Sequence, residues 1–282
     1  MGTVLSAEEL SAWLAAGEEV VLVDCRFALA EPSAGERAYR DGHLPGAFFL
    51  DIERDLSSEV VAGMTGRHPL PHLDEVASKL GRIGVGPGVR VVAYDQDNGM
   101  FAARLWWLCR FLGHGDVWVL DGGVNEWVKG GRPLQVEVPS GRPRDFSTLY
   151  LHPESIVAAD EVESMVENPD ARLFDARSAE RFRGENETID PVAGHIPGAR
   201  SLPFADSLEG GRFRSPEQLR ARFEAALAGR SSEEAVAYCG SGITACHLIL
   251  AAEHAGLPGI RLYPGSWSEW IVEPSRPVAT GA

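Results

Sequence analysis

The sequence predicts an α/β protein made of two tandem copies of one domain, each with a parallel β-sheet flanked by helices. The first observation is an internal repeat: segments 21–26 (VLVDCR) and 42–47 (GHLPGA) return in the same order at 172–177 (RLFDAR) and 194–199 (GHIPGA). The second is that short apolar runs alternate with helix-like segments inside each copy. A repeat period of about 150 residues is the length of a domain, so two α/β domains follow rather than a solenoid.

The first copy contains six predicted elements. Its first helix, over 6–16, begins with the capping box that Ser6 and Glu9 form. The other elements are recognised by β-branched and apolar runs, which predict strands, or by apolar residues three and four apart, which predict helices. They are the strand 20–25, the helix 73–80, the strand 89–94, the helix 101–112 and the strand 117–120.

The second copy repeats this order. Ser215 before Pro216 is typical of a helix start and predicts a helix over 216–228. The stretch 133–152 is rich in Pro, Gly and Arg and predicts an interdomain linker, with one domain at 1–132 and the other at 153–282. The remaining predicted elements are the strands 173–175, 235–238 and 261–263 and the helix 243–256.

The composition favours a soluble protein with small-molecule partners. The net charge of −15 opposes binding to nucleic acid and to anionic membranes, and no apolar run approaches the ~20 residues of a membrane span. The first ten residues lack a basic start followed by an apolar stretch, so we expect no secretory signal and a cytoplasmic location. The four cysteines include no Cys-x-x-Cys pair, which argues against a disulfide framework and against bound metal.

The segment 239–245 (CGSGITA) carries the predicted nucleophile. Cys239 follows a buried strand and precedes a helix, and the glycines at 240 and 242 let backbone N–H groups turn toward its sulfur. Such donors, together with a helix N-terminus, stabilise a thiolate, which is the reactive form of cysteine. A packing role for Cys239 is the alternative, but packing alone requires neither glycine. The other cysteines are predicted to pack in the core: Cys25, Cys109 and Cys246.

The repeat provides an internal comparison for this segment. Residues 92–95 (VAYD) match 236–239 (VAYC), so Asp95 occupies the place of Cys239 in the first copy. A carboxylate cannot accept a sulfur atom, and we therefore expect the first domain to be catalytically inactive. Asp95 itself is interpreted as a carboxylate that caps its loop.

Together these motifs resemble a tandem-domain rhodanese, a family of sulfurtransferases, over nearly the whole chain. The resemblance rests on the paired Gly-His-x-Pro-Gly-Ala turns, the Tyr-Cys loop, the Trp-containing end of each copy and the altered loop at Asp95. It implies two rhodanese-like domains, each with a five-stranded parallel sheet, and a persulfide formed on Cys239. Within the family, the loop is similar to the 3-mercaptopyruvate branch, whose Cys-Gly-Ser-Gly-Val-Thr-Ala motif differs here only at Ile243. The loop residues Gly240, Gly242, Ile243 and Thr244 are thereby implied to bind substrate.

The charge of the loop favours the same donor. Thiosulfate is a dianion and benefits from fixed positive charge beside the thiolate, but residues 240–245 contain no cation. With 3-mercaptopyruvate, Ser241 can supply a proton to the enolate that leaves as pyruvate. Thiosulfate sulfurtransferase activity, which yields sulfite and thiocyanate, is the alternative function, and a helix N-cap is the alternative role of Ser241.

The resemblance implies that Arg181 binds the substrate carboxylate, for which a guanidinium is well shaped. From spacing alone, Arg177 and Arg183 are equal candidates. A second substrate arginine found in some relatives has no evident counterpart, because the corresponding stretch 185–190 reads ENETID.

The resemblance also implies a proton relay to Ser241. His68 in the segment 67–71 (RHPLP) matches the relay histidine, and histidine exchanges protons readily near neutral pH. Its acidic partner falls at Glu53, a position that is usually Asp, with Asp51 as the nearby alternative. His43 and His195 occur in both repeated turns and are interpreted as structural.

The expected cycle needs no cofactor. The acceptors implied by the resemblance are cyanide or a thiol such as thioredoxin or a low-molecular-weight thiol. Two other classes are weighed. A Cys-x5-Arg phosphatase is disfavoured because Ala245 stands where the phosphate-clamping arginine is required. A non-catalytic binding scaffold is a remote alternative for the second domain, because Cys239 is retained.

Overall fold

The computed structural model describes residues 2–146 and 152–282, and these form two compact units. Within the described residues, the first unit comprises 2–58, 71–146, 152 and 210–213, and the second comprises 59–70, 153–209 and 214–282. The segment 59–70, which belongs to the first repeat in sequence, is thus part of the second unit. This grouping matters for the site, because the segment contains His68.

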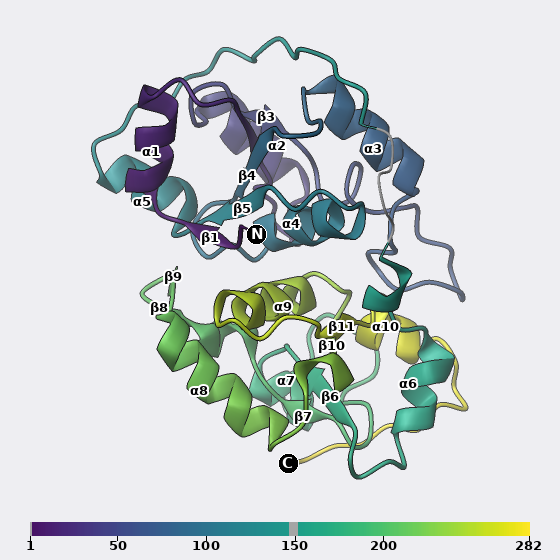
Figure 1. Cartoon of the computed structure of the whole chain (residues 1–282). Coiled ribbons are helices and arrows are strands. Elements are labelled where there is room, and N and C mark those ends of the chain that lie inside the picture. Colours follow the sequence, from purple (N-terminus) through teal and green to yellow (C-terminus); the bar gives the residue numbers. More distant parts are fainter. Residues whose placement is uncertain (1, 147–151) are drawn as a thin grey trace. The chain divides into compact units, whose positions relative to one another are not determined.

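The first unit contains a parallel sheet of five strands, in the order β1-β5-β4-β2-β3. Among its strands, β1, β3, β4 and β5 are labelled in Figure 1. The expected number of strands is therefore present. Helices lie around this sheet, and most predicted boundaries agree with the observed ones to within two residues. The strands are β1 (Val4–Leu5), β2 (Val20–Asp24), β3 (Phe48–Phe49), β4 (Arg90–Tyr94) and β5 (Val117–Leu120); β9 (Arg212–Phe213) also falls in this unit. The helices are α1 (Ala7–Ala15), α2 (Ser33–Asp41), α3 (Leu73–Arg82), α4 (Ala102–Phe111) and α5 (Gly123–Lys129).

The second unit contains a parallel sheet of four strands, in the order β11-β10-β6-β7. The fifth strand expected here is reduced to a single parallel bridge between Ile156 and Leu262. The strands are β6 (Arg172–Asp175), β7 (Arg200–Ser201), β10 (Ala235–Tyr238) and β11 (Arg261–Leu262), with β8 (Leu208–Glu209) outside the sheet. The helices are α6 (Ala159–Met165), α7 (Ala179–Arg183), α8 (Pro216–Leu227), α9 (Thr244–His254) and α10 (Ser266–Trp270), with 3₁₀ turns at Pro153–Ser155, Phe204–Ser207 and Ser232–Glu234.

The predicted helix starts at Ser6 and Ser215 are confirmed. Each serine side chain accepts a hydrogen bond from the third helical residue, and that residue, Glu9 or Gln218, bonds back to the serine N–H. The helix after Cys239 begins one residue later than predicted, at Thr244. None of the helices in the described part of the chain combines the length and apolar character that a bilayer span requires.

The two units repeat the same buried contacts. In the first, the Tyr94 hydroxyl accepts a hydrogen bond from the N–H of Leu44; in the second, Tyr238 does so from Ile196, both at 3.2 Å. Each hydroxyl thus connects a strand of the sheet, β4 or β10, to a Gly-His-x-Pro-Gly turn by a hydrogen bond. The apolar sets beside them are also alike. They include Leu22, Val92, Tyr94 and Trp127 in the first unit and Leu173, Val236, Tyr238 and Trp270 in the second.

The histidines of the repeated turns are structural in both units. His43 and His195 are buried, and the Nδ1 atom of each is hydrogen bonded to a backbone carbonyl, of Tyr39 and Phe182 respectively. Each ring also stacks on the same aromatic residue whose carbonyl it contacts. This agrees with the interpretation drawn from their presence in both copies.

Candidate active site

Cys239 stands at the carboxyl end of β10, where the chain turns into α9. The Cys239 side chain is buried, and the N–H of Gly242 donates a hydrogen bond to its sulfur at 3.1 Å. Gly242 has a φ of +78°, and a Cβ there would lie 2.4 Å from the carbonyl oxygen of Pro264. Only glycine therefore lets this N–H reach the sulfur.

The backbone of the loop is fixed by the start of α10. The N–H of Cys239 donates to Oγ of Ser266 at 3.1 Å, and its carbonyl accepts from the N–H of Trp267 at 2.9 Å. The carbonyl of Gly240 accepts from the N–H of Ser268, also at 2.9 Å. These hydrogen bonds satisfy these backbone groups of Cys239 and Gly240 inside the protein and fix the start of the loop against α10.

Ser241 contacts His68 within the second unit. The Oγ atom of Ser241 lies 2.7 Å from Nδ1 of His68, and both side chains are buried. The helix after the loop has Ile243 as its N-cap and no side-chain cap, so the alternative role of Ser241 as an N-cap is wrong. Its hydroxyl is hydrogen bonded to the one histidine that the sequence resemblance singled out.

The three arginines that were equal candidates from their spacing occupy different environments. Arg177 makes a bidentate ion pair with Asp175 and donates to the carbonyl of Gly194, as Arg26 does with Asp24 and Gly42 in the first unit. Because the first unit, which has Asp95 in place of Cys239, contains the same arrangement, this pair belongs to the framework of both units. Arg183 pairs with Glu185 at the surface.

Arg181 lies at the loop. Its Nε atom donates to Glu187 and its Nη2 atom to Asp190, both at 2.9 Å. A Cβ added at Gly240 would lie 3.5 Å from Nη2 of Arg181, so the missing side chain at Gly240 leaves this guanidinium in contact range of the loop. Glu187 is itself held by the N–H groups of Ile189 and Asp190.

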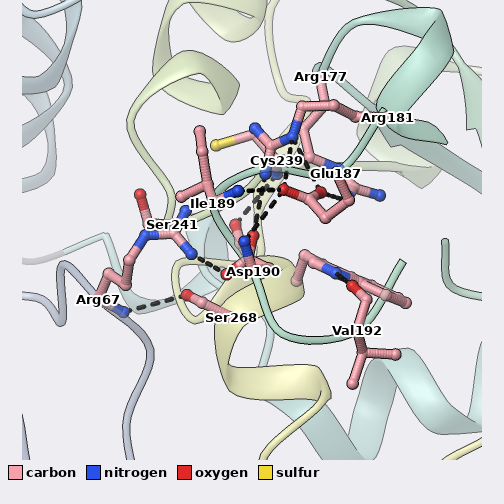
Figure 2. A network of polar contacts seen from close by, with 12 residues as sticks. Arg67, Arg177, Arg181, Glu187, Ile189, Asp190, Val192, Cys239, Ser241 and Ser268 are labelled. Atoms are coloured by element: carbon pink, nitrogen blue, oxygen red, sulfur yellow. Dashed lines mark hydrogen bonds and ion pairs between the residues drawn. The ribbon is translucent and has the colours of Figure 1, made fainter. Parts of the chain in front are cut away.

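A fourth arginine, Arg67, lies at the same place and was not among the predicted site residues. Its guanidinium is ion-paired with Asp190, and its backbone N–H donates to Oγ of Ser268 at 3.0 Å (Figure 2). The same imagined Cβ at Gly240 would lie 2.7 Å from Nη2 of Arg67. Burial lowers the pKa of Arg67, while a charge on Cys239 acts in the opposite direction.

Sequence reasoning overlooked Arg67, Glu187 and Asp190. The available signal was the set of three acidic side chains in the stretch 185–190, directly after a segment with three arginines. Carboxylates of this kind hold guanidinium groups in place. The partner Arg67 is more than 100 residues away in sequence, so only the folded chain identifies it.

Glu53 and Asp51 belong to the first unit. Oδ1 of Asp51 accepts hydrogen bonds from the N–H groups of Glu53 and Arg54, both at 2.9 Å, so Asp51 caps its own turn. Partial desolvation and the charge of Asp51 raise the pKa of Glu53 above its usual value. The assignment of Glu53 to the proton relay stays a prediction.

The other three cysteines are fully buried. Burial raises the pKa of Cys109 to about 12 and that of Cys25 well above the usual value, so both remain thiols. The Cys246 thiol donates a hydrogen bond to the carbonyl of Gly242 at 3.1 Å and so contacts the backbone of the loop. Their packing roles agree with the expectation from sequence.

The loop of the first unit is closed by its own carboxylate. Asp95 is buried and accepts hydrogen bonds from the N–H groups of Asp97, Gly99, Phe101 and Ala102. Backbone donors that could hold an anion are thus bound to Asp95, which confirms its interpretation as a capping residue. No cluster of three or more metal-binding side chains occurs among residues 2–146 and 152–282.

Comparison with known proteins gives one family. The model of the rhodanese-like domain matches residues 6–130 and 158–273. A probable 3-mercaptopyruvate sulfurtransferase of Pseudomonas aeruginosa is 51% identical, covering 99% of this chain and 98% of the relative. A putative thiosulfate sulfurtransferase of Mycobacterium tuberculosis is 37% identical over 99% of this chain and 97% of the relative. Among solved structures, the 3-mercaptopyruvate sulfurtransferase from Leishmania major has a TM-score of 0.82 at 32% identity, covering 95% of this chain and 74% of that one.

Proposed function

The chain belongs to the rhodanese-like family of sulfurtransferases, and from this premise we propose that it uses 3-mercaptopyruvate as its sulfur donor. The sulfane sulfur passes through a persulfide on Cys239 to a thiol or to cyanide, and pyruvate is released. The relatives named for this donor, in Pseudomonas aeruginosa and Leishmania major, support the proposal. The geometry around Cys239 supports it independently.

The observation that carries the proposal is the hydrogen bond between Ser241 and His68. Ser241 follows the nucleophile Cys239 by two positions in the sequence. When 3-mercaptopyruvate loses its sulfur, the leaving group is an enolate whose carbon must receive a proton. When thiosulfate loses its outer sulfur, the leaving sulfite needs none. A buried serine and histidine pair beside Cys239 is a proton donor that only the first reaction requires.

The first half-reaction forms one sulfur–sulfur bond and breaks one carbon–sulfur bond. The Cys239 thiolate attacks the thiol sulfur of the donor, the bonding electrons go to the carbon, and Ser241 with His68 delivers the proton that completes pyruvate. The N–H of Gly242 stabilises the attacking sulfur. In the second half-reaction, an acceptor thiolate or cyanide attacks the outer sulfur of the persulfide and regenerates the Cys239 thiolate.

The remaining loop residues act through their backbone. Gly240 leaves room for Arg181, which binds the carboxylate of the donor. Ile243 and Thr244 open α9, whose first N–H groups direct their positive ends toward the loop. We expect the acceptor to be thioredoxin or a low-molecular-weight thiol in the reducing cytoplasm, the compartment that the cysteine usage favours.

Thiosulfate is the second candidate donor, for a specific reason. The loop itself carries no cation, but Arg67 and Arg181 bring two guanidinium groups to Gly240 from other segments. Positive charge beside the thiolate is what a dianionic donor requires. A relative named for this activity matches over nearly the full length of the chain.

The deciding experiment measures kcat/KM for 3-mercaptopyruvate and thiosulfate side by side, with cyanide as the acceptor. The proposal requires the larger value for 3-mercaptopyruvate and loss of turnover with both donors in Cys239→Ser. A larger value for thiosulfate would replace the proposed donor by the second candidate. Turnover that survives Cys239→Ser would exclude a persulfide on this residue.

A further inference from the structure

Asp190 joins two guanidinium groups beside the catalytic loop. Its Oδ2 atom accepts from Nη2 of Arg181 at 2.9 Å, and its Oδ1 atom is ion-paired with Nη1 of Arg67. The Asp190 side chain is only 2% exposed, so its carboxylate interacts with the two arginines rather than with solvent. Both guanidinium groups are thereby turned toward the same side of the Cys239 loop, at Gly240.

Arg67 retains a hydrogen-bonding group that the protein does not use. Its Nε atom is buried and has no hydrogen-bond partner among the described residues. Arg181, in contrast, donates its Nε to Glu187 and its Nη2 to Asp190. A buried guanidinium N–H without a partner is costly, and an incoming anion would remove that cost.

The two guanidinium groups at Gly240 already have acidic partners. Arg67 and Arg181 are balanced by Glu187 and Asp190, so this four-residue group carries no net charge before the donor binds. The nearby sulfur of Cys239 is negative when it attacks, and it is the strongest influence that raises the pKa of Arg67. The Arg67 guanidinium therefore lies close enough to Cys239 to interact with the charge of its sulfur.

We propose that Arg67 binds the anionic group of the sulfur donor, alongside Arg181. The inference rests on the proposed function. In 3-mercaptopyruvate the carboxylate is separated from the transferred sulfur by two carbon atoms. The donor can thus place its sulfur at Cys239 while its carboxylate reaches the guanidinium groups above Gly240.

The first test does not depend on the identity of the donor. Cys239 is alkylated with iodoacetate, which carries a carboxylate, and with the neutral iodoacetamide; in each case the thiolate forms a carbon–sulfur bond and iodide leaves. In Arg67→Gln we expect the ratio of the two rates, iodoacetate over iodoacetamide, to fall about tenfold, the effect of one lost charge-assisted hydrogen bond. Arg183→Gln is the matched control, because it removes a surface guanidinium that pairs with Glu185, and its ratio should equal that of the unmodified protein.

The second test uses turnover. Arg67→Gln should raise KM for 3-mercaptopyruvate about tenfold with a smaller change in kcat, and Arg67→Lys should recover part of the loss because it retains the charge. An unchanged alkylation ratio in Arg67→Gln, or an equal slowing with both reagents, would overturn the inference. If the ratio falls but 3-mercaptopyruvate is not turned over, the proposed function fails and Arg67 remains an anion-binding residue for another donor.

Discussion

At the scale of single residues, chemically identical side chains are given different roles by their surroundings. The sulfur of Cys239 accepts a backbone hydrogen bond from Gly242, whereas burial raises the pKa of Cys25 and Cys109. The same holds for the arginines: Arg177 is buried in an ion pair that the first repeat also contains, but Arg181 lies against Gly240. Residue type alone does not separate these cases.

Ser241 allows a prediction at this scale. In Ser241→Ala, kcat with 3-mercaptopyruvate should fall by about 10²-fold or more, because the enolate loses its proton donor. Turnover of thiosulfate should change far less, since sulfite leaves without a proton. Steady-state kinetics with both donors check this, and thiosulfate serves as the control for loop integrity. If kcat fell equally with both donors, Ser241 would instead be needed to maintain the conformation of the loop.

At the scale of elements, the strand, loop and helix that hold Cys239 in the second unit have a counterpart in the first. Both loops follow a buried strand whose last residue is tyrosine, in β4 and β10, and both lead into a buried helix, α4 or α9. In the second unit the loop N–H of Gly242 is directed at sulfur. In the first unit four N–H groups are bound by Asp95. The side chain that follows the strand, Asp95 or Cys239, therefore decides whether the backbone N–H groups of the loop are occupied by a carboxylate or directed at a sulfur.

The glycines of the two loops provide a matched pair of variants. Gly242 and Gly99 both have positive φ, +78° and +77°, so the backbone strain of alanine at either position should cost about 1–2 kcal/mol of stability. Gly242→Ala should also abolish persulfide formation, because its Cβ would collide with the carbonyl of Pro264 and displace the N–H from Cys239. Gly99→Ala should leave kcat within about twofold. Thermal unfolding and turnover of both variants test this, and activity retained in Gly242→Ala would contradict the role given to its N–H.

At the scale of the whole molecule, the chain is a duplication in which one copy retains the nucleophile. The framework was retained in both units, including the Asp-Arg pair after the central strand, the histidine stacked in each turn and the tyrosine that bonds to that turn. The second unit also includes the segment 59–70 from the first repeat, which supplies Arg67 and His68. The site is therefore built from both copies in sequence but lies within one compact unit.

Cys239 is expected to be the one reactive thiol of the chain, which gives a prediction for the whole protein. Incubation with donor in the absence of an acceptor should add the mass of one sulfur atom per chain, located on the peptide that contains Cys239. Cys25 and Cys109 should acquire none at mildly alkaline pH, because their raised pKa values keep them protonated. Intact and peptide mass spectrometry measure this, with Cys239→Ser as the blank. A second sulfur on any other cysteine would show that burial does not protect the remaining thiols.

The sequence by itself determined the duplication and the fold class, and it predicted Cys239 as the nucleophile. These depend on local signals: hydrophobic periodicity, the capping serines at 6 and 215, and the glycines that flank Ser241. Each signal acts within a few residues of chain, so periodicity and turn chemistry are sufficient to read it. The comparison of Cys239 with Asp95 also needed only the repeat.

The tertiary structure alone decided which charged residues meet at the loop. Arg177, Arg181 and Arg183 are indistinguishable by spacing, but they differ in burial and in partners once α7 is packed. Arg67 and Asp190 are 123 positions apart, and Ser241 and His68 are 173 apart. Contacts at such separations depend on how sheets and loops fold back on one another, and no local pattern encodes them. The ion-paired group of Arg67, Arg181, Glu187 and Asp190 is for this reason recognised only in the folded chain.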